Sequence, residues 1–342
     1  MFEREDYMLY SYIGETANEV WEKAVLDLKK STKNVNSRAG KTVENLHSIF
    51  QIANPVQRWV TKRWEPISLS FALAEIIWIL SGSNDAKLLN IWNPALPKYA
   101  GYGDTYHGAY GYRIRKNYGF DQLERAYNAL SQNCQSRQVV ISIWDARIDM
   151  PNEKGEPADS DIPCNICSFL KVRQGKLDWT QMMRSNDVHR GFPYNVVQYT
   201  ILQEILAGWL GIDVGAYTHY SDSLHYYVTD NFEINGKNNI CSYNTDSLRT
   251  TKEQFDEIVR KMYQIMQIMA FNDVSERELA SLMSESLGNE AYDNIMAMIT
   301  LYIAHKKRYY NLEQKLLHSC TNKIYCDMWN AWINRKNMNK GI

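Results

Sequence analysis

The sequence predicts an α+β protein that carries an α-helical C-terminal extension. Residues 138–144 form a β-branched run typical of a strand, and residues 168–184 have the pattern of a β-hairpin around a Gln-Gly turn. Helical patterns lie on both sides of these strands in the chain, and after about residue 240 only helical patterns follow. We therefore expect one α+β domain over residues 1–240 and a helical extension over residues 241–342.

The composition excludes several classes of protein. With 38 basic and 39 acidic residues the formal net charge is −1, so no overall positive field attracts nucleic acid. The longest apolar run, residues 71–80, is too short to span a membrane and contains Glu75. The first residues show no secretory signal, and the six cysteines lack a disulfide-scaffold spacing. We expect a cytoplasmic protein with no membrane or nucleic-acid partner.

The N-terminal third predicts two helices. Residues 16–30 begin with Thr16 and Glu19, which have the spacing of a capping box, and carry an apolar face. Residues 66–80 predict a buried helix with a proline in its first turn. Glu75 is the exceptional residue there, because burial among apolar side chains raises the pKa of an unpaired carboxyl group. Glu75 is therefore either a general acid/base or a partner in a buried salt bridge.

The predicted hairpin brings chemically useful side chains together. Cys164 precedes its first strand and Arg184 follows its second, so both are expected in one pocket. An arginine followed by Ser185 suits a phosphate group, because guanidinium and hydroxyl groups donate hydrogen bonds to its oxygens. Asn195 offers a donor and an acceptor for the edge of a nucleobase, and a cysteine thiolate can attack an electrophilic ring carbon. Taken singly, these residues also fit a surface pair, a helix cap and a packed thiol.

The rest of the chain predicts further helices. A helix follows Asn195 and ends at Gly211. In the extension, residues 251–271 carry an apolar stripe, and Ser275 with Glu278 forms another capping box. Methionine and aromatic stripes in this region indicate packing rather than a cofactor site.

Three strings together resemble the thymidylate synthase family in order and spacing. They are PCN at 163–165, RSNDVHRGFPYN at 184–195 and SDSLHYY at 221–227. The resemblance covers about residues 35–230 and implies a thymidylate synthase-like mixed β-sheet flanked by helices, in a catalytic domain over residues 1–240. It also implies folate-dependent transfer of a one-carbon unit from 5,10-methylenetetrahydrofolate to C5 of a uridylate-type nucleoside monophosphate, with no metal ion.

The resemblance assigns roles to individual residues. Cys164 attacks C6 of the pyrimidine, Glu75 manages protons through ordered water, and Tyr110 lies near the thiol. The phosphate is bound by Arg38, Arg137, Arg184 and Ser185, the base by Asn195, and the sugar by His225 and Tyr227. The folate is contacted by Asp187, Trp92 and Gly191. Because family arginines at the position of Arg137 reach the phosphate of the partner subunit, the resemblance implies a homodimer.

The chain departs from the family pattern at several positions. Asn165 replaces the histidine that usually follows the thiol, Phe169 replaces a glutamine, and Gln138 replaces the second arginine of the cross-subunit pair. The C-terminal segment that covers the folate in the family is not recognisable. Its loss would admit water and allow hydroxymethylation, although the resemblance places methylation first.

The resemblance also bears on the substrate. Family members that act on cytidylate tend to carry an aspartate at the position of Asn195, so the asparagine favours uracil over cytosine. The choice between ribose and deoxyribose stays open, as does the role of the helical extension.

Two other interpretations belong to different functional classes. Cys164 and Cys167 have the Cys-x-x-Cys spacing of a zinc or redox site, but no second pair completes four ligands. A non-catalytic nucleotide-binding sensor would also explain a phosphate site with an altered arginine pair. Because a sensor needs neither a nucleophile nor a proton carrier, Cys164 and Glu75 together favour an enzyme.

Overall fold

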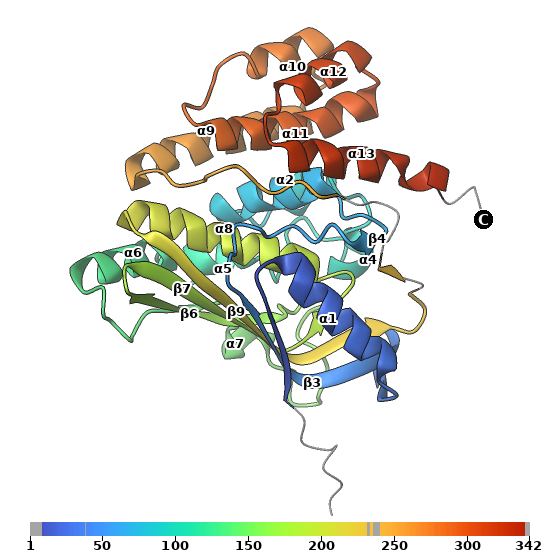
Figure 1. Cartoon of the computed structure of the whole chain (residues 1–342), viewed down its shortest axis with the longest axis vertical. Coiled ribbons are helices and arrows are strands. Elements are labelled where there is room, and N and C mark those ends of the chain that lie inside the picture. The colour runs from blue at the N-terminus through green and yellow to red at the C-terminus, as the bar shows by residue number, and fades with distance from the viewer. Residues whose placement is uncertain (1–8, 38, 231–232, 235–239, 339–342) are drawn as a thin grey trace, which may run out of the picture. The chain divides into compact units, whose positions relative to one another are not determined.

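The structure, a computed structural model, divides into two compact units (Figure 1). It describes residues 9–37, 39–230, 233–234 and 240–338. The first unit is drawn from residues 1–67, 123–144 and 164–239. The second unit is drawn from residues 68–122, 145–163 and 240–342.

A mixed β-sheet forms the centre of the first unit, as the sequence predicts. Its strands are β1 (Tyr10–Gly14), β2 (Asn34–Ser37), β3 (Gly40–Ile52), β5 (Val140–Ser142), β6 (Asn165–Arg173), β7 (Lys176–Met183), β8 (Asn186–Asp187) and β9 (Asp213–Tyr227). The order is β1-β3-β9-β7-β6-β5, with β2 paired to β3 and β8 paired to β9. β7 and β8 run parallel to β9, whereas β3 runs antiparallel to it. A separate short sheet pairs β4 (Arg63–Trp64) with β10 (Glu233–Ile234).

Helices α1 (Ala17–Lys30) and α8 (Phe192–Leu210) pack against this sheet (Figure 1). The N-cap predicted at the start of α1 is confirmed, because the Thr16 hydroxyl accepts the backbone N–H of Glu19 at 3.3 Å. The second bond of the predicted capping box is not, since the Glu19 carboxylate accepts the backbone N–H of Glu15 at 2.9 Å rather than that of Thr16. α8 is buried on nearly all sides and ends at Gly211 in the left-handed conformation. The helix α6 (Gln122–Gln132) lies beside α8, where the rings of Tyr127 and Trp209 meet edge to face.

The hairpin that organises the site is confirmed. β6 and β7 pair antiparallel around a turn at Gln174 and Gly175, both in left-handed backbone conformations. The register shifts between Asn165 and Cys167, so a β-bulge lies at the start of β6, directly after Cys164. The strand predicted over residues 138–144 is shorter in the structure, since only β5 forms there.

The second unit is mainly helical, and it contains α2 (Leu69–Leu80). Its other helices are α3 (Ala86–Asn90), α4 (Pro97–Ala100), α5 (Tyr110–Arg115), α7 (Ala146–Asp149), α9 (Lys252–Phe271), α10 (Glu276–Leu282), α11 (Glu290–Lys307), α12 (Tyr310–Ser319) and α13 (Lys323–Met338). α2 begins three residues later than predicted, because the Ser68 hydroxyl rather than Pro66 opens it: that hydroxyl accepts the N–H of Phe71.

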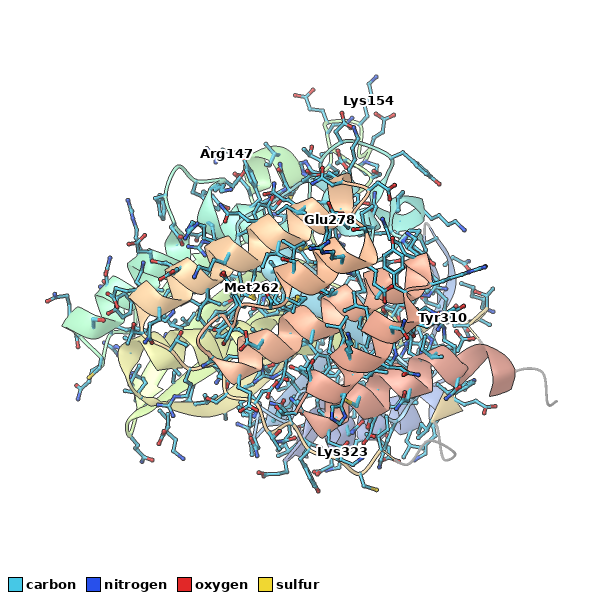
Figure 2. The ribbon with its side chains drawn as sticks, turned by 90° about the horizontal axis from the view of Figure 1, so that it is seen from above. Arg147, Lys154, Met262, Glu278, Tyr310 and Lys323 are labelled. Atoms are coloured by element: carbon cyan, nitrogen blue, oxygen red, sulfur yellow. The ribbon has the colours of Figure 1, made fainter. Side chains whose placement is uncertain are left out.

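The C-terminal helices complete the core of the second unit. α9, α11 and α13 pack against α2, and Figure 2 shows their side chains, with Met262 labelled on α9 and Lys323 on α13. The Ser70 hydroxyl and the Trp92 indole N–H donate to the carbonyls of Met298 and Ile299 on α11, at 2.7 and 3.1 Å. Although α11 is almost entirely buried, none of the helices in the described ranges is long and apolar enough to cross a membrane. The expectation of a separate extension over residues 241–342 stays a prediction.

A buried ion pair anchors α8 inside the first unit. Arg58, which follows β3, donates a hydrogen bond to Glu204 on α8, and each side chain is only 2% exposed. Removing one partner of such a pair leaves an uncompensated buried charge.

We expect Glu204→Ala to lower the free energy of unfolding by about 3–5 kcal/mol, measured by chemical denaturation, because Arg58 would lose its buried counter-ion. The double variant Arg58→Met with Glu204→Met should recover most of that loss, since it removes both charges and keeps the volume. A double variant as unstable as Glu204→Ala would show that the pair is not what anchors α8.

Candidate active site

The thiol of Cys164 and the guanidinium of Arg184 meet at one end of the β6–β7 hairpin. The backbone N–H of Arg184 donates to the carbonyl of Cys164 at 2.9 Å, which extends the ladder by one residue beyond each strand. The Nη2 of Arg184 lies 3.9 Å from the Sγ of Cys164. A positive charge at this distance favours the thiolate over the thiol, and the thiolate is the nucleophilic form. The predicted juxtaposition of these two residues is confirmed.

Trp144 and Ser185 complete this end of the sheet. The guanidinium carbon of Arg184 lies 5.6 Å from the centroid of the Trp144 ring, within the range of a cation–π contact. This contact helps to orient the guanidinium. Ser185 follows Arg184 directly and is half-buried between β7 and β8.

Asp187 carries a buried acceptor without a partner. Its Oδ1 accepts the backbone N–H groups of His189 and Arg190 at 2.8 and 2.7 Å. Its Oδ2 is buried and has no hydrogen bond to any residue that the structure describes. Burial raises the pKa of Asp187 above its ordinary value, and the backbone donors offset that effect only in part. An orphaned buried oxygen of this kind fits a ligand that donates an N–H group.

Asn195 lies in the first turns of α8 and is almost fully buried. The sequence predicts a helix that begins after Asn195; the structure corrects this, because Gly191 is the N-cap and the helix starts at Phe192. The Nδ2 of Asn195 donates to the Oδ1 of Asn186 at 3.4 Å. Gly191 leaves room for this pair, since a Cβ there would lie 3.1 Å from the Asn186 oxygen.

His225 and Tyr227 lie at the end of β9. Their rings meet edge to face with centroids 5.6 Å apart, and β8 pairs with β9 so that Asp187 is opposite His225. Arg190 lies over the Tyr227 ring at 4.8 Å and is paired with Asp230. The sheet therefore brings both predicted sugar-binding residues beside Asp187.

Asn165, the residue after the thiol, belongs to a buried polar layer. Its Oδ1 accepts from the Nε2 of Gln181 at 2.9 Å, and the side-chain oxygen Oε1 of Gln181 accepts from Ser168 and Trp179. The Nδ2 of Asn165 is buried and has no partner among the residues that the structure covers. This unsatisfied donor belongs to the residue that follows Cys164 in the chain.

Three predicted site residues belong to the second unit. Glu75 is the one residue of α2 that keeps substantial solvent exposure, whereas the other residues of the helix are buried. Glu75 is thus half-buried on the buried helix that the sequence predicts, and its role as a general acid/base stays a prediction. Tyr110 is the first residue of α5 and is also half-buried. Trp92 is 2% exposed and packs in the core, with its N–H bonded to Ile299.

The remaining predictions concern arginines and metals. Arg137 is exposed in the turn before β5, as a residue that reaches another subunit would be. Arg38 lies outside the described residues. Within the described ranges, no three His, Cys, Asp or Glu side chains are grouped as metal ligands. Neither Cys164 nor Cys167 forms a disulfide within the part of the chain that the structure describes, and burial raises the pKa of Cys167.

Sequence reasoning missed the residues that support this site. Asn186 lies inside the RSNDVHRGFPYN string but at a position that carries no signal by residue type. Gln181 and His219 lie on strands β7 and β9, opposite one another in register. Only the alternation of buried positions along a strand could have indicated that such polar residues face inward.

We expect Arg184→Met to slow alkylation of Cys164 by iodoacetamide about tenfold at pH 7, because the guanidinium no longer favours the thiolate. Peptide mass spectrometry measures the rate at Cys164 separately from the other cysteines. Arg173→Met is the matched control, since that arginine lies on the same hairpin and donates to the carbonyl of Val172. Equal rates in the two variants would contradict the proposed activation.

The pH dependence of Asp187→Asn tests the buried carboxyl. Because folding raises the pKa of Asp187, its contribution to stability is present below its unfolded pKa and is lost as pH rises through the folded pKa. The free energy of unfolding of Asp187→Asn, taken relative to that of the wild type, should therefore increase as pH rises from about 3.5 to 8. Denaturation curves at both ends of that range measure this difference, and a difference independent of pH would contradict it.

Comparisons with known proteins identify a family model and several relatives that are similar to this chain. The family model described as thymidylate synthase matches residues 21–305, and so extends beyond the point near residue 240 at which the motif resemblance ends. A deoxyuridylate hydroxymethyltransferase of Bacillus phage SP01 is 30% identical over 65% of this chain and 60% of that protein. A protein of the same description from Pseudomonas phage M6 is 33% identical over 51% of this chain and 48% of that protein.

Two further relatives carry the family description itself. A thymidylate synthase of Clostridium beijerinckii is 28% identical over 62% of this chain and 74% of that protein. The crystal structure of thymidylate synthase from T4 phage aligns with a TM-score of 0.47 at 23% identity, over 61% of this chain and 76% of that one. The match spans less than two thirds of the two phage hydroxymethyltransferases. Because the family model matches well over half of this chain, the chain belongs to the thymidylate synthase family.

Proposed function

We propose that this protein catalyses folate-dependent transfer of a one-carbon unit to C5 of deoxyuridylate. The observation that carries the proposal is the contact between Cys164 and Arg184, 3.9 Å apart at the end of a hairpin in a chain of this family. A nucleophile beside a cation that also suits a phosphate is what a covalent reaction on a nucleotide requires.

Cys164 supplies the covalent step of the proposed reaction. Its thiolate forms a bond to C6 of the pyrimidine, and the electron pair of the C5–C6 double bond moves toward C5 and O4. C5, which is otherwise a poor nucleophile, can then bond to the incoming carbon. The C5 proton must leave before the thiolate is expelled, and we assign proton transfer at O4 and C5 to Glu75. The resemblance adds Tyr110 to the catalytic residues.

Specific side chains bind the nucleotide in this proposal. Arg184 and Ser185 bind the phosphate, Arg38 closes over it, and Arg137 reaches it from the partner subunit of a homodimer. His225 and Tyr227 bind the sugar hydroxyl, and Asn195 binds the N3–O4 edge of the base. A monomer by sedimentation at assay concentration would contradict the role of Arg137.

The residues present fit 5,10-methylenetetrahydrofolate as co-substrate. The orphaned Oδ2 of Asp187 is an acceptor for an N–H group of the pterin, and Gly191 keeps the adjacent space free of a side chain. The resemblance adds Trp92 to this site. When bound, the folate supplies the one-carbon unit and, in methylation, the hydride.

The choice of deoxyuridylate rests on two supports. Asn195 matches the family members that act on uracil, and the two phage relatives are described as acting on deoxyuridylate. The second support also bears on the sugar, which the sequence leaves open. The cytoplasmic location expected from the sequence stays a prediction.

The outcome at C5 has two candidates. Methylation is the outcome that the family resemblance places first, and it requires that water be excluded from the reacting carbon. Hydroxymethylation adds water instead, and the descriptions of the two phage relatives favour it. The buried, unsatisfied Nδ2 of Asn165, one residue from the nucleophile, is a donor that could orient such a water.

One assay tests the proposal and separates its two outcomes. The protein is combined with dUMP and 5,10-methylenetetrahydrofolate, and product mass is recorded together with absorbance for dihydrofolate. Methylation yields dihydrofolate and a methylated product, whereas hydroxymethylation yields tetrahydrofolate and a product heavier by one oxygen.

We expect Cys164→Ser to lower turnover by about a thousandfold or more, because it removes the nucleophile. Cys167→Ser is the matched control and should keep most of the activity. No modified nucleotide from the wild type would refute the enzyme and favour a nucleotide-binding sensor. Equal losses in the two serine variants would refute the assigned nucleophile.

A further inference from the structure

We propose that Asn186 selects uracil over cytosine by fixing which way round the carboxamide of Asn195 faces the ligand. This inference rests on the proposed function, because it assumes that Asn195 contacts the pyrimidine edge. It assigns base specificity to a second asparagine that does not itself need to touch the nucleotide.

Asn186 is held on three sides within the first unit. Its Nδ2 lies 2.8 Å from the Nε2 of His219 and donates to the hydroxyl of Ser221 at 3.2 Å. Its Oδ1 accepts from the Nδ2 of Asn195 at 3.4 Å. Asn186 is 2% exposed, and both His219 and Ser221 are fully buried. Breaking one of these contacts would leave a buried polar group unsatisfied, which opposes rotation of the Asn186 amide.

His219 determines the direction of the hydrogen bonds through Asn186. Complete burial lowers the pKa of His219 to about 3, so the ring is neutral and carries one proton. An amide Nδ2 only donates, and Nε2 must therefore be the acceptor in this contact. The ring proton is then on Nδ1, 2.8 Å from the buried hydroxyl of Tyr217. Reversal of Asn186 would require the other tautomer and would turn its Nδ2 toward the Nδ2 of Asn195, so the bond to Asn195 would be lost.

The direction of the Asn195 amide decides which base it matches. Uracil presents a donor at N3 and an acceptor at O4, whereas cytosine presents an acceptor at N3 and a donor at N4. An asparagine carboxamide can match either edge, but changing from one edge to the other requires a half-turn about its Cβ–Cγ bond. With the ring fixed by its bond to Cys164, one orientation of Asn195 serves uracil and the opposite one serves cytosine.

Asn186 opposes that half-turn. In the observed orientation Asn195 gives one N–H to the Asn186 oxygen. In this proposal, its second N–H and its own oxygen contact the pyrimidine edge. After a half-turn, the two amide oxygens would face each other, and a buried hydrogen bond would be replaced by repulsion between two acceptors. The geometry thus excludes the cytosine-reading orientation as long as Asn186 is present.

The test compares the binding of dUMP and dCMP to full-length protein by calorimetry. For Asn186→Ala, the ratio of dUMP to dCMP affinity should fall about tenfold, the usual effect of one hydrogen bond. Asn186→Asp should keep the wild-type ratio within about threefold, because a carboxylate still accepts from Asn195. Ser168→Ala is the control: it removes a fully buried hydroxyl of the same sheet that contacts Gln181 rather than Asn195, and should leave the ratio unchanged.

The outcomes separate this inference from the proposed function. If the wild type prefers dUMP and Asn186→Ala keeps the full ratio, or if Ser168→Ala lowers it equally, the role of Asn186 is refuted while the proposed function stands. If the wild type binds neither nucleotide, the proposed function fails and the inference fails with it.

A second measurement does not depend on whether the variants fold. Nitrogen-15 NMR of the histidine rings in the wild-type protein reports which nitrogen of His219 carries the proton. We expect a protonated Nδ1 and an unprotonated Nε2 at neutral pH. A proton on Nε2 would mean that the Asn186 oxygen faces His219, which would overturn the inference.

Discussion

The chemistry of this protein depends on the register of the β6–β7 hairpin. The bond from the Arg184 N–H to the Cys164 carbonyl fixes two residues, 20 positions apart in the chain, at one end of the sheet. Their side chains are then close enough for the guanidinium to stabilise a thiolate. A slip of one residue would turn every side chain of β6 to the opposite face and separate the two groups. The β-bulge at the start of β6 bends the strand directly after Cys164, and so affects the direction of the backbone at the nucleophile.

Behind that end of the sheet, the face under α8 carries polar residues where an apolar core would be more stable. Asn165, Gln181, Asn186 and His219 are almost fully buried, and hydrogen bonds within the layer offset part of their desolvation cost. Asn165 and Asp187 each keep one buried polar atom without a partner in the described chain. Buried polar atoms without a hydrogen bond lower the stability of the fold, and they are expected where a bound ligand supplies the missing partner.

Much of the architecture could be predicted from the sequence, because local signals determine it. The N-cap of α1, the capping boxes of α9 and α10, the Gly211 end of α8 and the β6–β7 turn all rest on residues a few positions apart. The motif strings also placed Cys164 and Arg184 together correctly. The burial and contacts of individual side chains were harder to predict. Glu75 is half-buried on a helix whose other residues are buried. Asn186 contacts His219 and Ser221 on β9, more than 30 residues away in the chain. Such contacts follow from sheet register rather than from local pattern.

The central claim is that Cys164 activates C5 of the pyrimidine by adding to C6. The most direct test uses dUMP labelled with tritium at C5, in the presence of 5,10-methylenetetrahydrofolate, and counts tritium released to water. Both methylation and hydroxymethylation require loss of that hydrogen, so the measurement does not depend on the outcome at C5. Our account predicts release by the wild type and none above background by Cys164→Ser. Release that persists undiminished in Cys164→Ser, or no release by the wild type, would contradict it.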